Sequence, residues 1–298
     1  LTTHNIKSKS FQWDTETQIS FNKNKLLGMT GTSATAIEGY GQWIDVVSHT
    51  EVGQPLYNFY GYKVVGIYQD KADIENYTNS LGNKVTPKSP ATPTKPYSRT
   101  NTTYVGDLKY EDVNLDGRID ENDRTNLGSP MPIFTFGFNN TFHYKNFDLN
   151  IMLQGVHGSE VLHLGKRFYT QMEGNQNQMR SVLNRWQSEE NPGDGWTPRA
   201  NSSTTGQNNA VSSRWVEDGS FIRINNLTLG YTLPKILINA WNVQNARFYL
   251  SVQNLATFSD YSGFNPETSH REDSVLAPGT DYGMYPLART YTVGMNVT

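Results

Sequence analysis

The sequence contains no cysteine. Disulfide bonds, thiolate metal sites and cysteine nucleophiles are therefore excluded within it. It also lacks any run of about 18 apolar residues, which excludes a transmembrane helix but leaves a membrane barrel open, since barrel strands are short and only half apolar. The first residues, LTTHNIKSKS, have no apolar core. We therefore expect no signal peptide there, and expect an exported protein to be a fragment or to be cut from a longer precursor.

Charge and aliphatic content are low as well. The formal net charge is −3 with a pI near 6.1, and no basic stripe is present, so we expect no nucleic-acid partner. Hydrophobic residues make up only 36% of 298 residues, yet aromatic residues reach 12%. This composition is typical of strands with aromatic girdles and polar inner faces. It also suits a secreted β protein that contacts carbohydrate.

Strict alternation of apolar and polar residues is clearest in Ile133–Tyr144, FTFGFNNTFHY after the isoleucine. Phenylalanine and tyrosine occupy one face of this predicted strand, and Thr, Gly, Asn and His occupy the other. Lys145-Asn146 predicts a tight turn, after which a second strand returns with its own apolar face. Residues expected to share one apolar, lipid-facing surface are Phe134, Phe136, Phe138, Leu149, Ile151, Leu153, Leu229, Leu250, Val252, Val293 and Met295.

Further strands are joined by connections of very unequal length. We expect a compact hairpin in Val52–Gln69, a long loop over Asp70–Asn101, a loop helix between Gly158 and Gln187 (Met179, Val182, Leu183, Trp186), and a long loop over Phe258–Leu287. The remaining predicted strands are Gln18–Met29, Gln42–Ser48, Phe221–Leu233, Ala246–Leu255 and Arg289–Thr298.

Strands of about 10 residues suit a tilted crossing of a bilayer. A soluble β-sandwich or propeller is the alternative, but its connections are seldom as long as these. Because a barrel must close and needs at least about eight strands, the seven candidates indicate either part of a larger barrel or a different fold. The loops after Ser48, Leu153 and Leu255 are expected outside the cell, and the Lys145 turn in the periplasm.

An oxygen-rich loop, DVNLDGRIDEND, precedes the alternating strands. Its spacing matches a calcium loop: positions one, three, five, seven, nine and twelve are Asp112, Asn114, Asp116, Arg118 (through its carbonyl), Asp120 and Asp123. Gly117 stands at position six, where the chain turns sharply. We expect one structural Ca²⁺, with Mg²⁺ as the second choice. The alternative is an Asx-rich turn that binds no ion.

Other candidate sites are less specific. Tyr57, Tyr60 and Tyr62 are the candidate substrate contacts, because their rings would stack on sugars, although hairpin packing explains them equally well. The six histidines show no metal-binding spacing. Glu189, Glu190 and Asp194 are the residues that a glycosidase would need, but a solvated loop is the simpler interpretation.

Several blocks together resemble a known family. They are QISFNKNKLL, GQPLYNFYGYKVVGIYQ, the segment from GDLKYEDVNLDG to NIMLQG, DGSFIRINNLTLGYTLP, ARFYLSVQNLATFSDYSGFNPE and YPLARTYTVGMNVT. In order and over nearly all of residues 1–298, they resemble the C-terminal part of the SusC/RagA-type TonB-dependent outer-membrane transporters. The resemblance implies an all-β fold, a portion of a 22-stranded transmembrane antiparallel barrel with long extracellular loops. The plug and the N-terminal strands are absent from these residues.

The resemblance also implies a function. Family members import oligosaccharides or peptides across the outer membrane of Gram-negative bacteria, pair with a SusD-like surface lipoprotein, and are driven by the TonB complex through their N-terminal part. On this basis the chain is a transporter component and not an enzyme. The alternative is a secreted calcium-binding β protein, such as a carbohydrate-binding module or an adhesin, which detergent-dependent solubility would distinguish.

Overall fold

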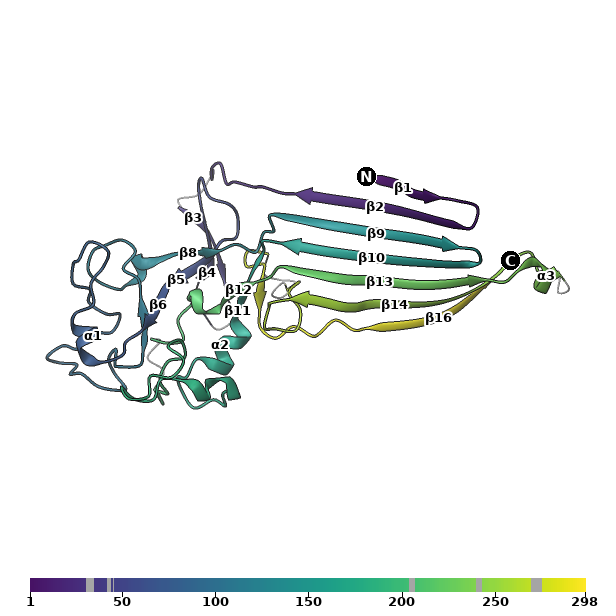
Figure 1. Ribbon diagram of the computed structural model, residues 1–298. Helices are drawn as coiled ribbons and strands as arrows, with labels where there is room; N and C mark the ends of the chain where they lie inside the picture. Colours follow the sequence, from purple (N-terminus) through teal and green to yellow (C-terminus); the bar gives the residue numbers. More distant parts are fainter. Residues whose placement is uncertain (31–34, 42–43, 45, 204–206, 240–242, 269–274) are drawn as a thin grey trace.

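A long antiparallel sheet and a globular loop region make up the chain (Figure 1). The computed structural model describes residues 1–30, 35–41, 44, 46–203, 207–239, 243–268 and 275–298. The longest connections leave one end of the sheet and fold together there, while the other end has short turns and the connection between β13 and β14 that contains α3. The chain is therefore all-β in architecture, with the loop region gathered at a single end of the strands.

Seven strands form the long sheet, in the order β1-β2-β9-β10-β13-β14-β16, and every neighbouring pair is antiparallel. Each strand thus follows its chain neighbour through the sheet, as in an up-and-down barrel wall. The outermost strands each have one partner, so the sheet is open at both edges within the described residues. The bounds are β1 Thr2–Lys7, β2 Phe11–Phe21, β9 Phe134–Tyr144, β10 Phe147–His157, β13 Phe221–Thr232, β14 Ala246–Ser259 and β16 Thr290–Val297.

The turn between β9 and β10 consists of Lys145 and Asn146 alone, as predicted. Lys145 adopts a left-handed backbone (φ 52°), which lets two residues reverse the chain. The Asn146 side chain donates to the Thr232 carbonyl at 2.8 Å, and the Lys145 amide donates to the Ser10 carbonyl at 3.0 Å. These bonds tie the turn to the strands on both sides, so the short-turn end of the sheet is well defined.

Three small sheets and short helices build the loop region. Their orders are β3-β4-β5-β8, β6-β7 and β12-β11-β15. The strand bounds are β3 Ala36–Tyr40, β4 Val46–Glu51, β5 Phe59–Tyr62, β6 Val64–Ile67, β7 Leu108–Tyr110, β8 Arg124–Gly128, β11 Glu160–His163, β12 Val216–Asp218 and β15 Thr280–Asp281. The α-helices are α1 Lys71–Glu75, α2 Leu164–Thr170 and α3 Lys235–Ile238, the last at the short-turn end.

The buried core lies in the loop region and not against the long sheet. One cluster of buried side chains includes Tyr68, Leu108 and Tyr110, and a second surrounds Phe59 and Trp215. In contrast, most large apolar side chains of the long sheet are partly or largely exposed. A sheet whose apolar face has no covering layer cannot be the stable half of a soluble sandwich.

Two predicted strand boundaries are wrong. Gln18–Met29 is displaced: β2 spans Phe11–Phe21, and the Leu26 amide instead pairs with the Gln54 carbonyl at 3.0 Å. Threonines 15 and 17 weaken the apolar alternation that would have marked the true strand. Gln42–Ser48 lies partly outside the described residues, and the strand there begins at Val46 and belongs to the loop region.

The predicted hairpin in Val52–Gln69 is also wrong. Only Lys63 separates β5 from β6, which is too few residues for the chain to reverse, so β5 pairs with β4 and β8 while β6 pairs with β7. A helix does occur between Gly158 and Gln187, but it is α2, and the residues predicted to form it lie around a 3₁₀ turn, Arg180–Asn184. Val182 and Trp186 are buried there, but Met179 and Leu183 are exposed, so no continuous helical stripe exists.

Candidate functional site

All eleven residues predicted to share an apolar surface lie on one face of the long sheet. Residues paired across antiparallel strands point to the same side, and the register places Leu149 beside Leu229, Leu229 beside Leu250, and Leu250 beside Val293. The opposite face carries asparagine, glutamine, threonine, serine and charged side chains. The sheet is therefore amphipathic along its full length and width.

Aromatic side chains border the apolar face at both ends of the strands. At the short-turn end, one register row crosses six neighbouring strands; its members are Phe11, Tyr144, Phe147, Tyr231, Phe248 and Met295. The rings of Phe147 and Tyr231 are 4.6 Å apart. At the loop end, a second aromatic border contains Phe21, Phe134, Phe136 and Phe258. Two aromatic borders with an apolar band between them are the pattern of membrane barrels.

The spacing of the borders fits a bilayer. Ten residues separate Phe134 from Tyr144 along β9, which corresponds to about 34 Å at the usual rise of a strand. A strand tilt of about 40° reduces this to a height of roughly 25 Å, the height of the apolar band of outer-membrane barrels. The length and the aromatic positions therefore agree with one crossing of a membrane.

The amide side chain of Asn140 lies in the middle of the apolar face, and its oxygen is hydrogen-bonded to the neighbouring strand. Asn140 is 8% exposed, and its Oδ1 accepts hydrogen bonds from Trp13 Nε1 and Thr15 Oγ1, both at 2.9 Å. A polar group in an apolar environment is tolerated when its hydrogen bonds are made. The sequence alone did not identify this pairing, because it joins residues 125 positions apart.

Hydrogen-bond ladders run along the polar face. Asn150 donates to Asn139 at 2.8 Å and to Thr141 at 3.1 Å. Towards the short-turn end, Arg247 reaches Asp148 at 2.9 Å, and the pair crosses above Gly230, where a Cβ atom would stand 2.4 Å from both side chains. These contacts make the polar face of the long sheet, which we call the wall, compatible with water.

The oxygen-rich loop places two carboxylates in its interior. Asp112 and Asp123 are 2% and 0% exposed, whereas Asn114, Asp116 and Arg118 lie at its exposed rim. Asp123 accepts from the Val113 and Asp120 amides at 2.9 and 2.7 Å. Burial raises the pKa of Asp123 above its ordinary value; backbone hydrogen bonds oppose the shift, and the neighbouring Asp112 carboxylate adds to it.

The candidate tyrosines are largely committed to packing. Tyr62 is 6% exposed, its ring contacts that of Tyr110 at 5.1 Å, and burial raises its pKa to about 12 although Arg124 opposes the shift. Tyr60 stacks on His49 at 4.4 Å and lies under the Arg124 guanidinium at 4.8 Å. Tyr57 is partly exposed, in a left-handed conformation with φ 69°. Tyr57 and Tyr60 thus keep more ring surface for a ligand than Tyr62.

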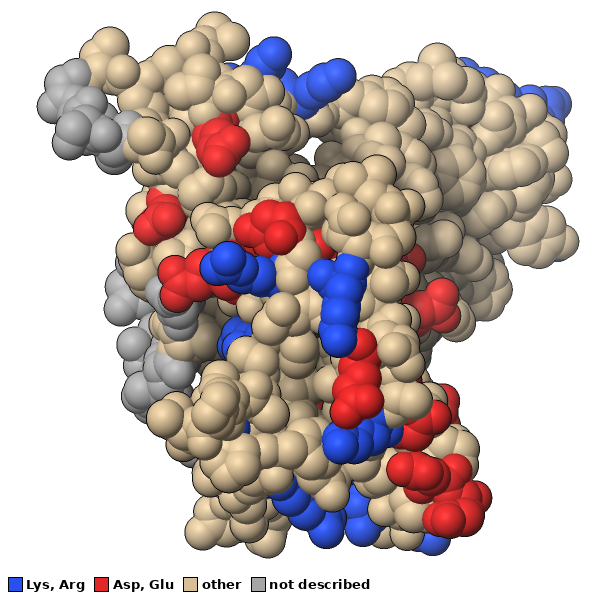
Figure 2. All heavy atoms as spheres, turned by 90° about the vertical axis from the view of Figure 1, so that its left-hand side faces the viewer, with Lys and Arg blue, Asp and Glu red and all other residues tan. Residues whose placement is uncertain are grey.

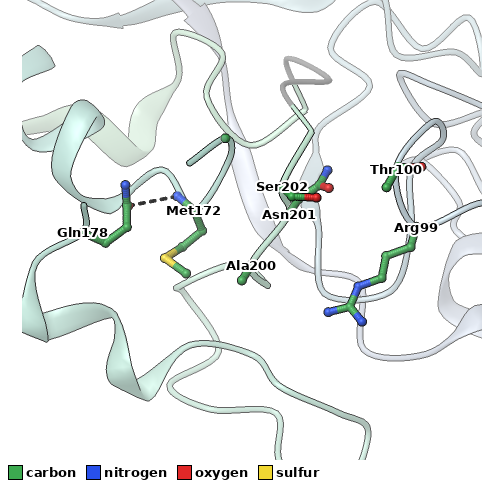
Figure 3. A pocket seen from close by; sticks show the side chains of 8 residues that line it. Arg99, Thr100, Met172, Gln178, Ala200, Asn201 and Ser202 are labelled. Atoms are coloured by element: carbon green, nitrogen blue, oxygen red, sulfur yellow. Dashed lines mark hydrogen bonds between the residues drawn. The ribbon is translucent and has the colours of Figure 1, made fainter. Parts of the chain in front are cut away.

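A pocket of about 560 Å³ with both polar and apolar lining opens in the loop region (Figure 3). Met172 and Gln178 lie on one side of Asn201 and Ser202, while Arg99 and Thr100 lie on the other. Met172 has a left-handed backbone (φ 61°), and its amide donates to the Gln178 side chain at 3.2 Å. The volume is in the range of ligand sites, and sequence inspection gave no indication of it.

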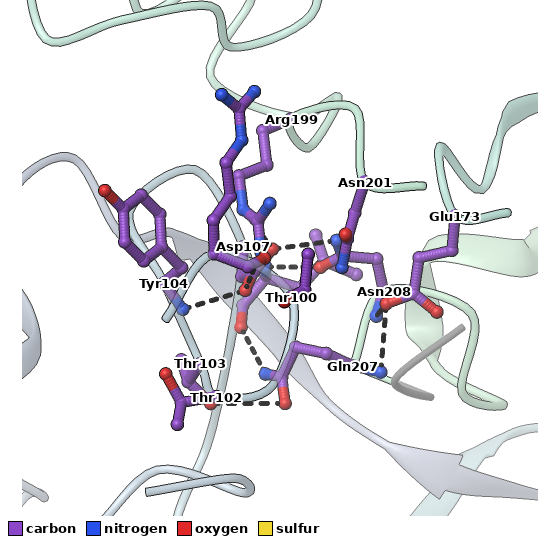
Figure 4. A network of polar contacts seen from close by, with 12 residues as sticks. Thr100, Thr102, Thr103, Tyr104, Asp107, Glu173, Arg199, Asn201, Gln207 and Asn208 are labelled. Carbon is purple, nitrogen blue, oxygen red and sulfur yellow. Dashed lines mark hydrogen bonds and ion pairs between the residues drawn. The ribbon is translucent and has the colours of Figure 1, made fainter. Parts of the chain in front are cut away.

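A network of buried polar side chains lies close to this pocket (Figure 4). Arg199 and Asp107 are each 1% exposed and pair at 2.9 Å. Asn208 donates to Asp107 at 3.0 Å, and Glu173 accepts from the Gln207 and Asn208 amides at 3.1 and 3.0 Å. The network joins segments about 100 residues apart, and therefore fixes the shape of the loop region.

The loops are also fastened to the wall. Arg223 of β13 is 4% exposed, donates to Thr257 at 2.9 Å and Asn265 at 3.2 Å, and pairs with Glu267. His163 of β11 lies 3.5 Å from Glu217 and 3.9 Å from Asp281.

Among the residues suggested for a glycosidase, Glu189 and Glu190 are exposed and Asp194 caps a turn by accepting from the Trp196 and Thr197 amides.

The sequence and fold have relatives among known proteins. TonB-dependent receptor P3 of Formosa agariphila is 33% identical over 100% of the chain, which spans 28% of that protein. TonB-dependent receptor SusC of Bacteroides thetaiotaomicron is 25% identical over 98% of the chain and 25% of its own length. Over its whole length the chain is similar to part of these TonB-dependent receptors. It thus spans only about a quarter of the length of these relatives.

Solved structures with a similar fold are also known. The RagAB peptide transporter matches with a TM-score of 0.72 and 20% identity, over 99% of the chain and 28% of the matched chain. The RagAB peptide importer in its open-open state matches with a TM-score of 0.70 and 18% identity. A scan against family models finds no match. Within the described residues, no helix is long and apolar enough to cross a membrane.

The two faces of the long sheet should differ in how strongly an introduced arginine destabilises the protein. In the full-length receptor, Phe138→Arg should lower the free energy of unfolding by about 2–4 kcal/mol, because it places a cation near the middle of the apolar band. The matched variant Asn139→Arg should cost about 1 kcal/mol, since it faces the polar side and loses only the bond from Asn150. Urea unfolding in lipid vesicles measures both, and equal costs would refute the assignment of faces.

The buried ion pair of the loop region predicts a local effect. Asp107→Ala leaves the Arg199 guanidinium buried and unpaired, and should destabilise the loop region by about 3–5 kcal/mol. Glu75→Ala removes an exposed partner of Lys71 and should change stability by less than about 0.5 kcal/mol. The stability of the loop region in each variant can be measured from the urea dependence of its proteolysis. Equal protease resistance in both variants would show that the network does not hold the loops.

Proposed function

We propose that this chain forms part of the wall and the extracellular loops of an outer-membrane, TonB-dependent nutrient importer. The observation that carries the proposal is the seven-stranded amphipathic sheet with aromatic borders about 25 Å apart. Because an open edge cannot remain in lipid, β1 and β16 require further strands. We assign these strands to the rest of a 22-stranded barrel, as the family resemblance implies.

The proposed orientation puts the loop region outside the cell. The connections at the other end are short, including the Lys145 turn and the segment from Leu233 to Asn245. Short periplasmic turns and long extracellular loops are the rule in such barrels. Charges of both signs are interspersed over the loop end (Figure 2), so a partner there would meet a mixed polar surface.

The proposed partners follow from the relatives. RagAB is a peptide importer, and SusC is a TonB-dependent receptor. By analogy, a SusD-like lipoprotein would cover the loop region, and the TonB complex would act through the N-terminal plug that lies outside these residues. The chain itself supplies passage walls and loops, with no catalytic role.

The proposed cargo is a polar oligomer, an oligosaccharide or a peptide. Three features suit such a ligand: the hydrogen-bonding face of the long sheet, the partly exposed Tyr57 and Tyr60 rings, and the pocket near Asn201, whose lining includes hydrogen-bonding side chains. A soluble, secreted calcium-binding protein would instead have to cover the apolar face of the sheet. Extraction of the native protein from cells without detergent would favour that alternative.

The orientation predicts which positions react from outside. Since the chain has no cysteine, single cysteines can be introduced at Leu81, which is 67% exposed in the loop region, and at Lys145. In intact cells carrying the full-length receptor without other cysteines, a membrane-impermeant maleimide should label position 81 and not position 145. Both should react after cell lysis. Labelling of position 145 alone in intact cells would invert the topology.

Uptake tests the import function directly. Deletion of the full-length gene should abolish accumulation of its labelled cargo, and restoration of the gene should recover it only when TonB is present. Parallel assays with labelled oligosaccharides and peptides assign the cargo class. Tyr60→Ala should reduce uptake more than the control Tyr285→Ala, whose ring is 91% exposed and lies outside the proposed contacts. Uptake that is independent of both the gene and TonB would contradict the proposal.

A further inference from the structure

The oxygen-rich loop contains a buried carboxylate oxygen without a partner. Asp112 Oδ2 accepts from the Gly117 amide at 2.9 Å and from Asn79 Nδ2 at 2.8 Å. Asp112 Oδ1 is buried and has no hydrogen-bond donor within the described residues. An unpaired anionic oxygen in a protein interior is costly, and such a group calls for a water or an ion.

No basic side chain of the described residues neutralises this interior. The ion pairs of the loop region nearest in sequence are Lys63–Glu111 and Lys109–Asp73, and neither involves the loop carboxylates. Asp123 uses its oxygens for the Val113 and Asp120 amides. Two buried acids therefore share one short segment without a cationic partner, and this favours a bound cation over a lone Asx-rich turn.

The rest of the loop supplies further oxygen atoms. Asn114, Asp116, the Arg118 carbonyl and Asp120 follow Asp112 at every second position. Gly117 has φ 81°, and a Cβ atom there would lie 2.9 Å from the Lys84 carbonyl oxygen, so the chain turns tightly at this point. No three carboxylate or imidazole groups converge anywhere in the described residues. A complete coordination sphere must accordingly include amide or backbone oxygens and water, which is usual for calcium.

We propose that residues 112–123 bind one Ca²⁺, with Asp112 Oδ1 as the central ligand, the Asn114 amide and the Arg118 carbonyl as further oxygen ligands, and Asp116, Asp120 and Asp123 contributing through bound water. Calcium is favoured over Mg²⁺ because it accepts six to eight oxygens in irregular geometry, whereas Mg²⁺ demands an octahedron and keeps its waters. A weak affinity, with a Kd of about 10⁻⁴–10⁻³ M as in extracellular modules, is sufficient outside the cell.

The bound ion would stabilise the loop region as a whole. Thr86 pairs with the loop through two backbone bonds, from its amide to the Gly117 carbonyl at 2.8 Å and from the Ile119 amide to its carbonyl at 2.9 Å. Ile119 is 4% exposed and belongs to the buried cluster around Tyr110. Neutralising the interior carboxylates therefore strengthens the contact between the 79–86 segment and the core.

Terbium luminescence offers a test, because Tb³⁺ replaces Ca²⁺ and is excited by nearby tyrosines. Tyr77 donates to the Tyr110 carbonyl at 2.9 Å. Asn79, two residues further along the chain, donates to Asp112, so Tyr77 lies on the segment that contacts the loop. Burial, with a smaller contribution from the Glu111, Asp112 and Asp123 carboxylates, raises the pKa of Tyr77 to about 12. The full-length receptor in detergent should give tyrosine-sensitised emission from one Tb³⁺, displaced by Ca²⁺ at lower concentration than by Mg²⁺. Tyr77→Phe should weaken the emission without changing the displacement by Ca²⁺.

Asp112→Asn is the decisive variant, and it should weaken Ca²⁺ displacement at least tenfold. Asp116→Asn, at the exposed rim, provides a second variant that keeps the buried contacts intact and should also weaken binding. Asp260→Asn is the matched control, an exposed aspartate outside the loop. Unchanged binding in both loop variants, or no sensitised emission at millimolar Tb³⁺, would overturn the site. Nutrient uptake is a separate measurement, so failure here leaves the transport proposal standing.

Discussion

Backbone hydrogen bonding within the long sheet is the constraint on which the rest of the structure depends. Lipid offers no hydrogen bonds, so each strand must be paired by its neighbours, and the side chains must divide by face. The register does this at most of the predicted positions: Phe138 meets Leu153, Leu149 meets Leu229, and Leu250 meets Val293, whereas Ile151 faces Asn140 on β9. Even Asn140, on the apolar side, has its acceptor occupied by neighbouring strands.

The loop region follows a different rule. It has the buried aromatic clusters and the buried Arg199–Asp107 pair that an ordinary soluble domain uses for stability. Arg223 and its contacts to Asn265 and Glu267 then connect this globular part to the wall. In the orientation that we propose, this globular part lies outside the cell, where a polar ligand would first meet the protein.

The sequence predicted the wall well and the loop region poorly. Alternation in β9 and β10 is strictly local, so the faces and the Lys145 turn could be predicted from adjacent residues. β1 was missed because TTHNIK carries little apolar signal, and it is a strand only because β2 pairs with it. In the loop region, pairing depends on contacts such as Tyr62 with residue 211 and Asp107 with Arg199, which no local pattern encodes. The oxygen-rich loop was recognised by spacing, but the burial of Asp112 emerged only from the fold.

The central claim is that one face of the sheet meets lipid and the other meets water. Spin labels placed singly at successive positions of β10, from Asp148 to Val156, in the full-length receptor test it most directly. Collision rates with oxygen and with a water-soluble nickel complex should alternate with a period of two, oxygen being favoured at Leu149, Ile151 and Leu153. Equal accessibility to both reagents at neighbouring positions would contradict the membrane-wall account.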